Sequence, residues 1–254
     1  MDGLTLEGRV ALVTGAGGGI GRRIALDLAS LGAVVAVCSR RGEGAEEVAS
    51  AVREAGASAR AYGAVDFVDR SAISELVRRV GADLGQVDVL VSNAGWEHVS
   101  PFVDSDPELW DRLLAINLRA PIQLTHAFLP GMVERNWGRL VYVSSDAGRV
   151  GSKGEAVYAA AKSGLFGFSK TIAREAARSG VTSNVVCPGP TDTPLLREVA
   201  AGNENLVAAL TRRIPAGRLG EPADVSGVVS FLASQRAAYV TGQTISVSGG
   251  LTMA

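Results

Sequence analysis

The sequence predicts an α/β fold in which a doubly wound parallel sheet carries helices on both faces. Short β-branched and apolar runs alternate with longer helical stretches, which is the pattern of consecutive βαβ units. The apolar runs are almost continuous, as expected of strands that are buried on both sides. A length of 254 residues suits one large α/β domain, so we expect residues 1–254 to form a single domain.

The first elements follow one another closely along the chain. Arg9–Thr14 is an apolar run that predicts a buried strand, and a glycine-rich turn separates it from a helix over Gly19–Leu31. The next apolar run, Ala33–Cys38, predicts the second strand, and Gly44–Ala55 predicts the helix after it. A short strand is expected at Ala59–Ala64.

The middle of the chain repeats this alternation. The pattern predicts a helix over Arg70–Leu84 and a strand over Val87–Ser92. The next helix is expected over Pro107–Leu118, with an extension to Glu134 open, because proline is well placed in a first helical turn. Leu140–Ser144 predicts the following strand.

The last third of the chain contains the longest predicted helix. Few helix breakers interrupt Glu155–Arg178, and the strand Val181–Cys187 is expected after it. A variable segment at about 190–220 is expected to form a substrate loop. A helix over Pro222–Ala233 and a strand over Gln243–Val247 complete the domain.

Composition and charge narrow the range of functions. Hydrophobic residues make up 47% of the chain and charged residues 20%, an ordinary globular composition. The formal net charge of −1 argues against nucleic acid or an anionic membrane as the main partner. Cys38 and Cys187 lie far apart in apolar runs, so we expect neither a disulfide framework nor a metal site. Because no signal-peptide stretch or bilayer-spanning run is present, we expect a cytoplasmic protein.

Four segments that carry candidate binding or catalytic residues each follow a predicted strand. They are Gly15–Gly21, Asn93–Gly95, Ser145 and Pro188–Thr193. In doubly wound sheets, ligands bind beyond the carboxyl ends of the strands. We therefore expect these four segments to form one site.

The glycine-rich segment predicts a dinucleotide site. Because it follows a strand and opens a helix, its backbone N–H groups and the helix N-terminus can face a pyrophosphate. The expected contacts come from Gly15, Gly19, Ile20 and Gly21.

The end of the second strand favours NADP(H) over NAD(H). An acidic residue there would hold the ribose 2′-hydroxyl, whereas arginine accommodates a 2′-phosphate. The sequence has Ser39, Arg40 and Arg41 and no acid, a set that matches a phosphate dianion. The alternative is NAD(H), with both arginines solvated on a loop.

Tyr158 and Lys162 form a candidate proton-transfer pair. Their i, i+4 spacing places them on one helix face, one turn apart. A phenol titrates near pH 10, and a nearby ammonium group lowers its pKa. A tyrosine tuned in this way can exchange a proton with an alcohol or carbonyl oxygen.

Taken together, these motifs resemble the short-chain dehydrogenase/reductase family, whose single domain is a Rossmann fold. The matches are TGxxxGxG at Thr14–Gly21, NAG at Asn93–Gly95 and YxxxK at Tyr158–Lys162. With Asn117 and Ser145 they complete the tetrad of the family. The resemblance covers the whole chain and implies a homotetrameric enzyme that interconverts a small-molecule secondary alcohol and a ketone.

The resemblance also implies roles for individual residues. Tyr158 would donate or accept the proton, and Lys162 would bind the nicotinamide ribose and lower the pKa of Tyr158. Ser145 would hold the substrate oxygen, and Asn117 would position a relay water. The other implied cofactor contacts are Asp66 at the adenine, Asn93 at the adenosine side, Thr191 and Thr193 at the carboxamide, and Ala94, Gly95, Pro188 and Gly189.

Longer stretches resemble one branch of the family, the 2-hydroxycyclohexanecarbonyl-CoA dehydrogenases, which oxidise a ring β-hydroxyacyl thioester. The matching stretches are Asn93–Trp96, Pro130–Arg135, Gly154–Ala160, Val186–Thr193 and Ser246–Met253. That branch is NAD-linked and has aspartate where this chain has Ser39. The resemblance implies a cyclic or β-ketoacyl substrate, including a CoA thioester, and NADP(H) would favour ketone reduction.

Two other functions stay open. A 3-oxoacyl-thioester (acyl carrier protein) reductase would use the same machinery on a different acyl group. A non-catalytic NADP-binding regulator would share the fold, but it would not need the complete tetrad.

Several neighbouring residues also have two interpretations. Ser144 is an alternative to Ser145, although the spacing to Tyr158 favours Ser145. Arg212 and Arg213 could meet a CoA phosphate, but a solvated helix face is the simpler expectation. Five residues are placed by their positions at the pocket border, where each could equally be a surface or packing residue: Trp96, Asp146, Arg149, Lys153 and Glu155.

Overall fold

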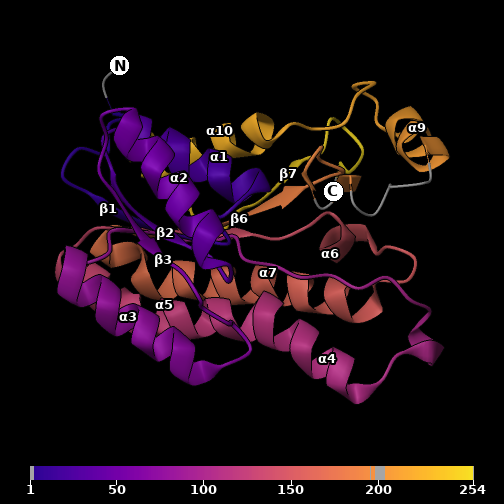
Figure 1. The fold of residues 1–254 in the computed structure, drawn as a ribbon, viewed down its shortest axis with the longest axis horizontal. Helices are drawn as coiled ribbons and strands as arrows, with labels where there is room; N and C mark the ends of the chain where they lie inside the picture. The colour runs from indigo at the N-terminus through magenta and orange to yellow at the C-terminus, as the bar shows by residue number, and fades with distance from the viewer. Residues whose placement is uncertain (1–2, 195, 198–203, 254) are drawn as a thin grey trace.

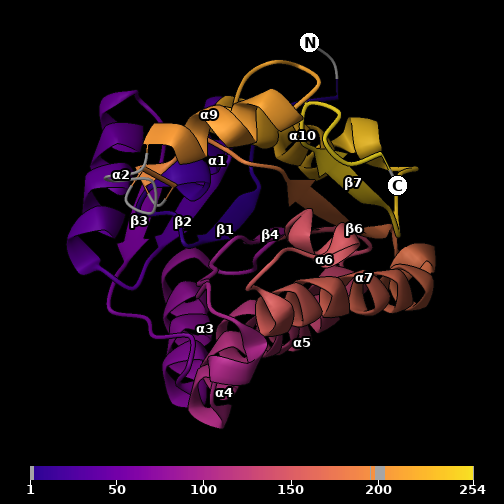
Figure 2. The ribbon, with the colours of Figure 1, turned by 90° about the vertical axis from the view of Figure 1, so that its right-hand side faces the viewer.

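A computed structural model of the chain describes residues 3–194, 196–197 and 204–253. Its centre is a sheet of seven parallel strands in the order β3-β2-β1-β4-β5-β6-β7. Helices α1, α2 and α10 cover one face of this sheet, and α3, α4, α5 and α7 lie on the other (Figures 1 and 2). The predicted doubly wound α/β fold is therefore confirmed.

All seven strands lie within two residues of the predicted ranges. They are β1 (Val10–Thr14), β2 (Val34–Cys38), β3 (Ala59–Tyr62), β4 (Val89–Ser92), β5 (Gly138–Val143), β6 (Val181–Pro188) and β7 (Thr244–Val247). The register pairs Thr14 with Cys38 and Val13 with Val91. The carboxyl ends of the central strands therefore reach the same edge of the sheet, and the loops that follow them meet there.

The main helices also follow the predicted pattern. They are α1 (Gly19–Ser30), α2 (Gly42–Glu54), α3 (Arg70–Leu84), α4 (Pro107–Leu114), α5 (Ala120–Glu134), α7 (Ala156–Ala176) and α10 (Pro222–Ala233). Two apolar clusters hold them to the sheet. On one face Ile24 and Leu28 of α1 pack with Leu232 of α10, and on the other Leu76 of α3 packs with Leu124 of α5. A fully buried side chain of this size contributes about 1.5–3 kcal/mol.

The helix predicted from Pro107 does extend to Glu134, but one of its turns is wider than the others. A π-helical turn at Ala115–Arg119 separates α4 from α5. Asp106 caps the start, because its carboxylate accepts a hydrogen bond from the Leu109 N–H at 2.8 Å. The wide turn buries the Asn117 side chain completely. Apolar spacing alone does not predict such a turn.

For two of the α-helices the sequence predicted no bounds. A short helix, α6 (Ala147–Val150), follows β5, and α9 (Glu204–Arg213) lies in the segment expected to form the substrate loop. Residues 195 and 198–203 of that predicted loop lie outside the described residues. No helix in the described part of the chain is long and apolar enough to cross a bilayer.

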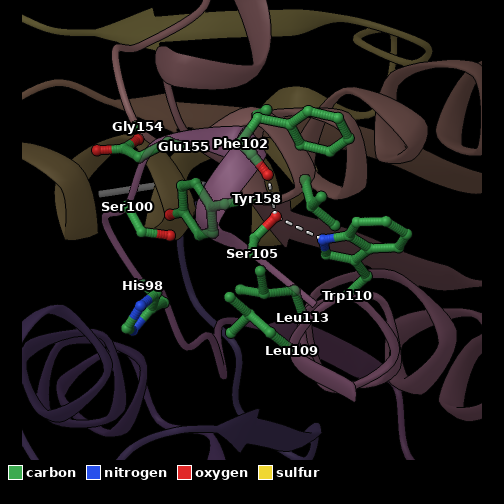
Figure 3. A pocket seen from close by; sticks show the side chains of 12 residues that line it. His98, Ser100, Phe102, Ser105, Leu109, Trp110, Leu113, Gly154, Glu155 and Tyr158 are labelled. Carbon is green, nitrogen blue, oxygen red and sulfur yellow. Dashed lines mark hydrogen bonds between the residues drawn. The ribbon is translucent and has the colours of Figure 1, made fainter. Parts of the chain in front are cut away.

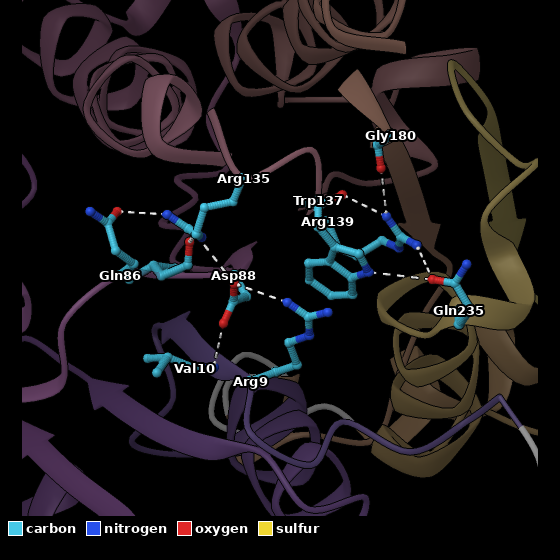
Figure 4. Close-up of polar contacts among 11 residues, drawn as sticks. Arg9, Val10, Gln86, Asp88, Arg135, Trp137, Arg139, Gly180 and Gln235 are labelled. Atoms are coloured by element: carbon cyan, nitrogen blue, oxygen red, sulfur yellow. Dashed lines mark hydrogen bonds and ion pairs between the residues drawn. The ribbon is translucent and has the colours of Figure 1, made fainter. Parts of the chain in front are cut away.

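A polar cluster fastens the amino ends of the strands, opposite the edge where the loops meet (Figure 4). The Asp88 carboxylate accepts hydrogen bonds from the Val10 N–H at 3.0 Å, from Arg135 at 3.2 Å and from Arg9 at 3.5 Å. The Trp137 ring lies between two guanidinium groups, 3.9 Å from that of Arg9 and 4.5 Å from that of Arg139. These contacts join β1, β4 and β5.

Arg139 is the most deeply buried charged group of this cluster, with 1% of its surface exposed. Its guanidinium donates to the backbone carbonyls of Gly138, Gly180 and Ser234 and to the side chain of Gln235. Burial lowers its pKa to about 10, and the charge of Arg9 adds to this effect. The guanidinium thus replaces water for several carbonyl groups at once.

Arg139→Met is expected to lower the free energy of unfolding by about 3 kcal/mol, because it leaves several buried carbonyls without donors. Urea denaturation of the purified protein measures the change. Arg178→Met is the matched control, since Arg178 is exposed. An equal and small loss in both variants would contradict the structural role given to Arg139.

Candidate active site

A cavity of about 470 Å³ lies at the carboxyl ends of the strands. All four segments that the sequence placed there contribute to its wall. Ile20 comes from the glycine-rich loop and Asn93 from the loop after β4. Ser145 follows β5, and Thr191 follows β6. The prediction that these segments meet at one site is therefore correct.

The glycine-rich loop has the shape that a pyrophosphate needs. Gly15 and Gly19 have φ values of +64° and +53°, which favour glycine. A Cβ atom on Gly21 would strike the Gly15 carbonyl oxygen. The residue before α1, Gly18, has no side chain to cap the helix, so the first N–H groups stay available to an anion. The loop therefore fits a dinucleotide.

The NAG segment supports this loop from the neighbouring strand. The Thr14 hydroxyl accepts hydrogen bonds from the N–H groups of Asn93 and Ala94, both at 3.0 Å. The Asn93 side-chain amide donates to the carbonyls of Thr14 at 3.0 Å and Gly15 at 3.2 Å. Asn93 also lines the cavity. Its first role in the structure is thus to hold the loop, which the sequence motif alone did not reveal.

The end of β2 lies beside the glycine-rich loop, as predicted. Ser39 is 8% exposed, and its side chain lies so close to Gly17 that a Cβ there would be 2.5 Å from the Ser39 hydroxyl. Arg40 and Arg41 are exposed and form no ion pair with a described residue. Asp66 is also exposed after β3, and its carboxylate accepts a hydrogen bond from the Val68 N–H.

The segment after β6 closes the other side of the dinucleotide loop. Gly189 lies so close to Ser248 that an added Cβ would be 2.7 Å from the Ser248 Cβ. Thr191 is 7% exposed and donates to the Gly189 carbonyl at 2.9 Å. The Thr193 methyl group would lie 3.6 Å from a Cβ on Gly19. Pro188–Thr193 and the glycine-rich loop therefore form adjoining walls, as predicted.

The two candidate serines have different environments. Ser144 is buried, and its hydroxyl donates to the Lys162 carbonyl at 2.9 Å. The Ser145 hydroxyl accepts a hydrogen bond from the Ala147 N–H at 3.1 Å, lines the cavity with Tyr158, and acts to lower the pKa of that phenol. Ser144 therefore fastens α7 to β5, while Ser145 is the serine paired with the tyrosine.

Tyr158 and Lys162 lie on the face of α7 that lines the cavity. The Lys162 ammonium is 5.7 Å from the centre of the Tyr158 ring and donates to the Val143 carbonyl at 2.9 Å. Lys162 is 3% exposed, and this burial lowers its pKa to about 8. The one-turn spacing predicted for this pair is thus confirmed.

The predicted lowering of the Tyr158 pKa is wrong for this structure. Burial raises the pKa of Tyr158 above its usual value, and the nearby Glu97 carboxylate raises it further. The Ser145 hydroxyl acts in the opposite direction. The Lys162 ammonium, which donates to the Val143 carbonyl, does not offset this rise. The phenol therefore favours its protonated form.

Asn117 uses its side chain to hold the loop after β4. Its amide donates to the carbonyls of Trp96 at 2.7 Å and Leu113 at 3.0 Å, and its oxygen accepts from the Trp96 N–H at 3.2 Å. A Cβ on Gly95 would lie 3.2 Å from this oxygen and 3.3 Å from the Lys162 nitrogen. Gly95 therefore keeps the approach between Asn117 and Lys162 open.

Three of the five residues predicted at the pocket border line the cavity. They are Trp96, Asp146 and Glu155. The prediction is wrong for Arg149, whose guanidinium donates to the Thr244 carbonyl at 2.8 Å, and for Lys153, which is exposed. Both residues lie on or beside α6, the helix that was not predicted. Arg213 of α9 lines the cavity as well.

The sequence reasoning missed Glu97, which lines the cavity with Glu155. Its position directly after the NAG motif and Trp96 was the available signal. Figure 3 shows a smaller cavity next to Tyr158, with a volume of about 10 Å³, enough for one water molecule. Its outer wall is the Phe102 ring stacked on Trp110 at 5.5 Å, and Trp110 donates to the Ser105 hydroxyl at 2.7 Å.

The fold and the site define an oxidoreductase that interconverts an alcohol and a ketone with a dinucleotide. Tyr158, Ser145 and the buried Lys162 share one cavity with the glycine-rich loop, whose shape suits a bound pyrophosphate. Cys38 and Cys187 are both buried and free. Among the described residues, no cluster of histidine, cysteine and acidic side chains could hold a metal ion.

Comparisons with known proteins agree with this class. A family model described as enoyl-(acyl carrier protein) reductase matches residues 15–252. The 3-oxoacyl-[acyl-carrier-protein] reductase FabG of Escherichia coli is 38% identical over 250 residues, which cover 98% of this chain and 100% of that protein. The FabG of Vibrio cholerae is 39% identical over the same length and the same shares of both chains.

Solved structures give the same result. A gluconate 5-dehydrogenase from Burkholderia cenocepacia, in complex with NADP and tartrate, superposes with a TM-score of 0.92 at 31% identity, covering 99% of this chain and 98% of that one. A short-chain type dehydrogenase/reductase from Mycobacterium marinum superposes with a TM-score of 0.92 at 29% identity and the same coverage. The chain belongs to the short-chain dehydrogenase/reductase family.

Proposed function

We propose that this protein is an NADP(H)-dependent reductase of β-ketoacyl compounds, with Tyr158 as the proton donor. The observation that carries the proposal is the meeting of Ser145, Tyr158 and Lys162 in one cavity with the dinucleotide loop. The complete set of four tetrad side chains supports an enzyme rather than a non-catalytic regulator. The same residues can run the reaction in the oxidative direction.

Each residue of the site has a definite task in this proposal. When bound, the nicotinamide supplies or accepts the hydride at the carbonyl carbon. Ser145 holds the substrate oxygen and Tyr158 gives it a proton, which is general acid catalysis. Lys162 binds the nicotinamide ribose. Asn117 fixes the Trp96 backbone and thereby the cavity wall, and its remaining oxygen lone pair suits the predicted relay water.

The preference for NADP(H) rests on the residues beside the dinucleotide loop. Ser39 presents a small hydroxyl at the loop. Because position 39 carries no carboxylate, a 2′-phosphate would not be repelled there. Arg40 and Arg41 are unpaired among the described residues and exposed next to it. The FabG relatives and the NADP complex of the Burkholderia dehydrogenase are consistent with this choice. The predicted contacts of the other cofactor-binding residues are part of the same proposal.

The acyl group is the less defined part of the substrate. FabG relatives favour a 3-oxoacyl thioester on acyl carrier protein, because the match covers nearly the whole chain. The resemblance to ring hydroxyacyl-CoA dehydrogenases makes a cyclic β-ketoacyl-CoA the second candidate. Both substrates place a ketone two carbons from a thioester, so the same site would serve either.

A cofactor-consumption assay tests the proposal. Purified protein is mixed with NADPH or NADH and a panel of cyclic and acyclic β-ketoacyl thioesters, their esters and simple ketones. We expect oxidation of NADPH with β-ketoacyl compounds above the rate with simple ketones. The absence of turnover with every ketone and both cofactors would contradict the proposal.

The pH dependence of ketone reduction is expected to follow the protonation state of Lys162. Its pKa is about 8, so the ammonium is charged below this pH and neutral above it. We expect kcat/KM to be constant at lower pH and to fall as the pH rises past about 8. The raised pKa of Tyr158 keeps the phenol protonated over the same range. Alcohol oxidation should instead rise with pH, because Tyr158 must then accept the proton.

The Lys162→Met variant tests whether Lys162 is the group whose titration sets the pH dependence. The variant should lower both kcat and the affinity for NADPH, because one side chain is proposed to serve both. It should also remove the fall above about pH 8. A wild-type pH break that persists in the variant would show that another group titrates there.

A homotetramer and a cytoplasmic location stay part of the proposal. Both follow from the resemblance to the family. Several apolar side chains exposed on helices would be covered in such an assembly, among them Leu114, Ile122 and Val133. Light scattering coupled to gel filtration measures the oligomeric state directly.

A further inference from the structure

Two carboxylates, Glu97 and Glu155, flank the proton donor inside the cavity. Glu155 immediately precedes α7, so Glu155, Tyr158 and Lys162 follow at i, i+3 and i+7 on one helix face. Glu97 approaches from the loop after β4, and both carboxylates line the cavity with Tyr158. Figure 3 shows Glu155 beside the Tyr158 ring.

The position of Glu97 is fixed by its neighbours. The backbone of Trp96 is held on both sides by the Asn117 side chain, at 2.7 and 3.2 Å. The ring of Trp96 lies under the guanidinium of Arg112 at 4.3 Å. Glu97 therefore extends from an anchored segment, and its charge stays near the reacting centre.

Neither carboxylate is neutralised by a described partner. Glu97 and Glu155 form no ion pair with a described residue and are only partly exposed. Burial raises the pKa of both groups, and the charge of Glu97 raises that of Glu155 further. These are the signs of two like charges that share a poorly solvated space.

The positive charges in the cavity do not cancel this pair at the tyrosine. Lys162 attracts Glu97, but its ammonium is hydrogen-bonded to the Val143 carbonyl. Arg213 lines the cavity from α9, yet the charged groups that act most on Tyr158 are Glu97 and Glu155. A substrate carbonyl that accepts the proton of Tyr158 therefore enters a negative field.

We propose that Glu97 and Glu155 make the enzyme select ketones with no negative charge near the carbonyl, and so reject free β-keto carboxylates in favour of their esters and thioesters. The inference rests on the proposed function and specifies its substrate class. A carboxylate two carbons from the ketone would lie close to the pair and be repelled, because like charges interact strongly in a partly buried site. Esterification or thioesterification removes that charge and leaves the ketone unchanged.

The test compares two substrates that differ only in this charge. Ethyl 3-oxobutanoate and 3-oxobutanoate carry the same ketone, and NADPH consumption at neutral pH gives kcat/KM for each. We expect the wild-type protein to prefer the ester by on the order of a hundredfold. Glu97→Gln and Glu155→Gln should each lower this ratio about five- to tenfold, and the double variant should lower it further.

Glu54→Gln is the matched control, because Glu54 is exposed at the end of α2. It should leave the ester-to-acid ratio unchanged. A second measurement needs only the wild-type protein: 3-oxobutanoate should inhibit ester reduction weakly, with an inhibition constant at least about tenfold above the KM of the ester. Binding of NADPH checks that each variant is folded.

The outcomes separate this inference from the proposed function. Equal use of ester and acid by the wild type, strong inhibition by the acid, or the same ratio in the glutamine variants as in Glu54→Gln would each overturn the selection by charge. Ketone reduction would still stand in those cases. If neither the ester nor any other ketone is reduced, the proposed function fails, and the inference fails with it.

Discussion

Tyr158→Phe is expected to lower kcat for ketone reduction by about 10²–10⁴-fold while leaving NADPH binding near the wild-type value. The substitution removes one hydroxyl from a ring whose packing is otherwise kept. The carbonyl oxygen then has no side chain to take its proton from, whereas Lys162 and the dinucleotide loop are unchanged. Steady-state rates with ethyl 3-oxobutanoate and a fluorescence titration with NADPH measure the two quantities.

The matched control is Tyr239→Phe, because Tyr239 is fully exposed and lies outside the cavity lining. It removes the same hydroxyl and should leave both measurements unchanged. Near-normal turnover by Tyr158→Phe would refute the proton-donor role. A parallel loss of NADPH binding would instead point to a structural role for the hydroxyl that pairs with Ser145.

The second large effect is expected from Ser39→Asp combined with Arg40→Leu, which should swing the cofactor preference from NADPH toward NADH. An aspartate at position 39 would accept hydrogen bonds from ribose hydroxyls and repel a 2′-phosphate. Loss of Arg40 removes a charge-assisted contact worth roughly 1.5–3 kcal/mol, or about ten- to a hundredfold in affinity. The ratio of kcat/KM for the two cofactors on one ketone measures the swing.

Two controls accompany this experiment. Arg178→Leu makes the same charge change as Arg40→Leu alone, at an exposed position remote from the cavity, and should leave the ratio unchanged. A thermal melt checks the fold, since Ser39 lies against Gly17 and a larger side chain there could displace the loop. If the parent protein prefers NADH, Arg40 and Arg41 are ordinary loop residues, and an oxidative role becomes the better proposal.

Much of the fold could be predicted because its local signals agree with one another. Short apolar runs such as Val34–Cys38 are typical of strands that are buried on both faces, so each run predicted a strand of a parallel sheet. The glycine-rich loop and the tyrosine–lysine pair were also predictable, because backbone shape and i, i+4 spacing are local properties. The meeting of the glycine-rich loop with Pro188–Thr193 was predictable too, because both segments follow strands of one parallel sheet and so lie at the same edge of it.

Other features depend on contacts between distant residues. The spacing to Tyr158 already favours Ser145, but the role of Ser144 depends on a contact that spacing does not show, the hydrogen bond from its hydroxyl to the Lys162 carbonyl. The rise in the Tyr158 pKa depends on burial and on Glu97, a residue sixty-one positions away in the chain. Helix α6 redirects Arg149 away from the cavity toward β7. None of these effects has a signature in the spacing of residue types.

The wide turn at Ala115–Arg119 has a consequence for anyone who redesigns this chain. An α-helix has 3.6 residues per turn, so one additional residue rotates everything after it by about 100°. The residues of α5 that face the sheet are therefore rotated about the helix axis relative to those that a regular continuation of α4 would place there. An idealised helix grafted over Pro107–Glu134 at the same length would turn Leu124 away from its apolar cluster, or Asn117 away from Trp96. Transplanting this region into another scaffold requires the irregular turn to move with it.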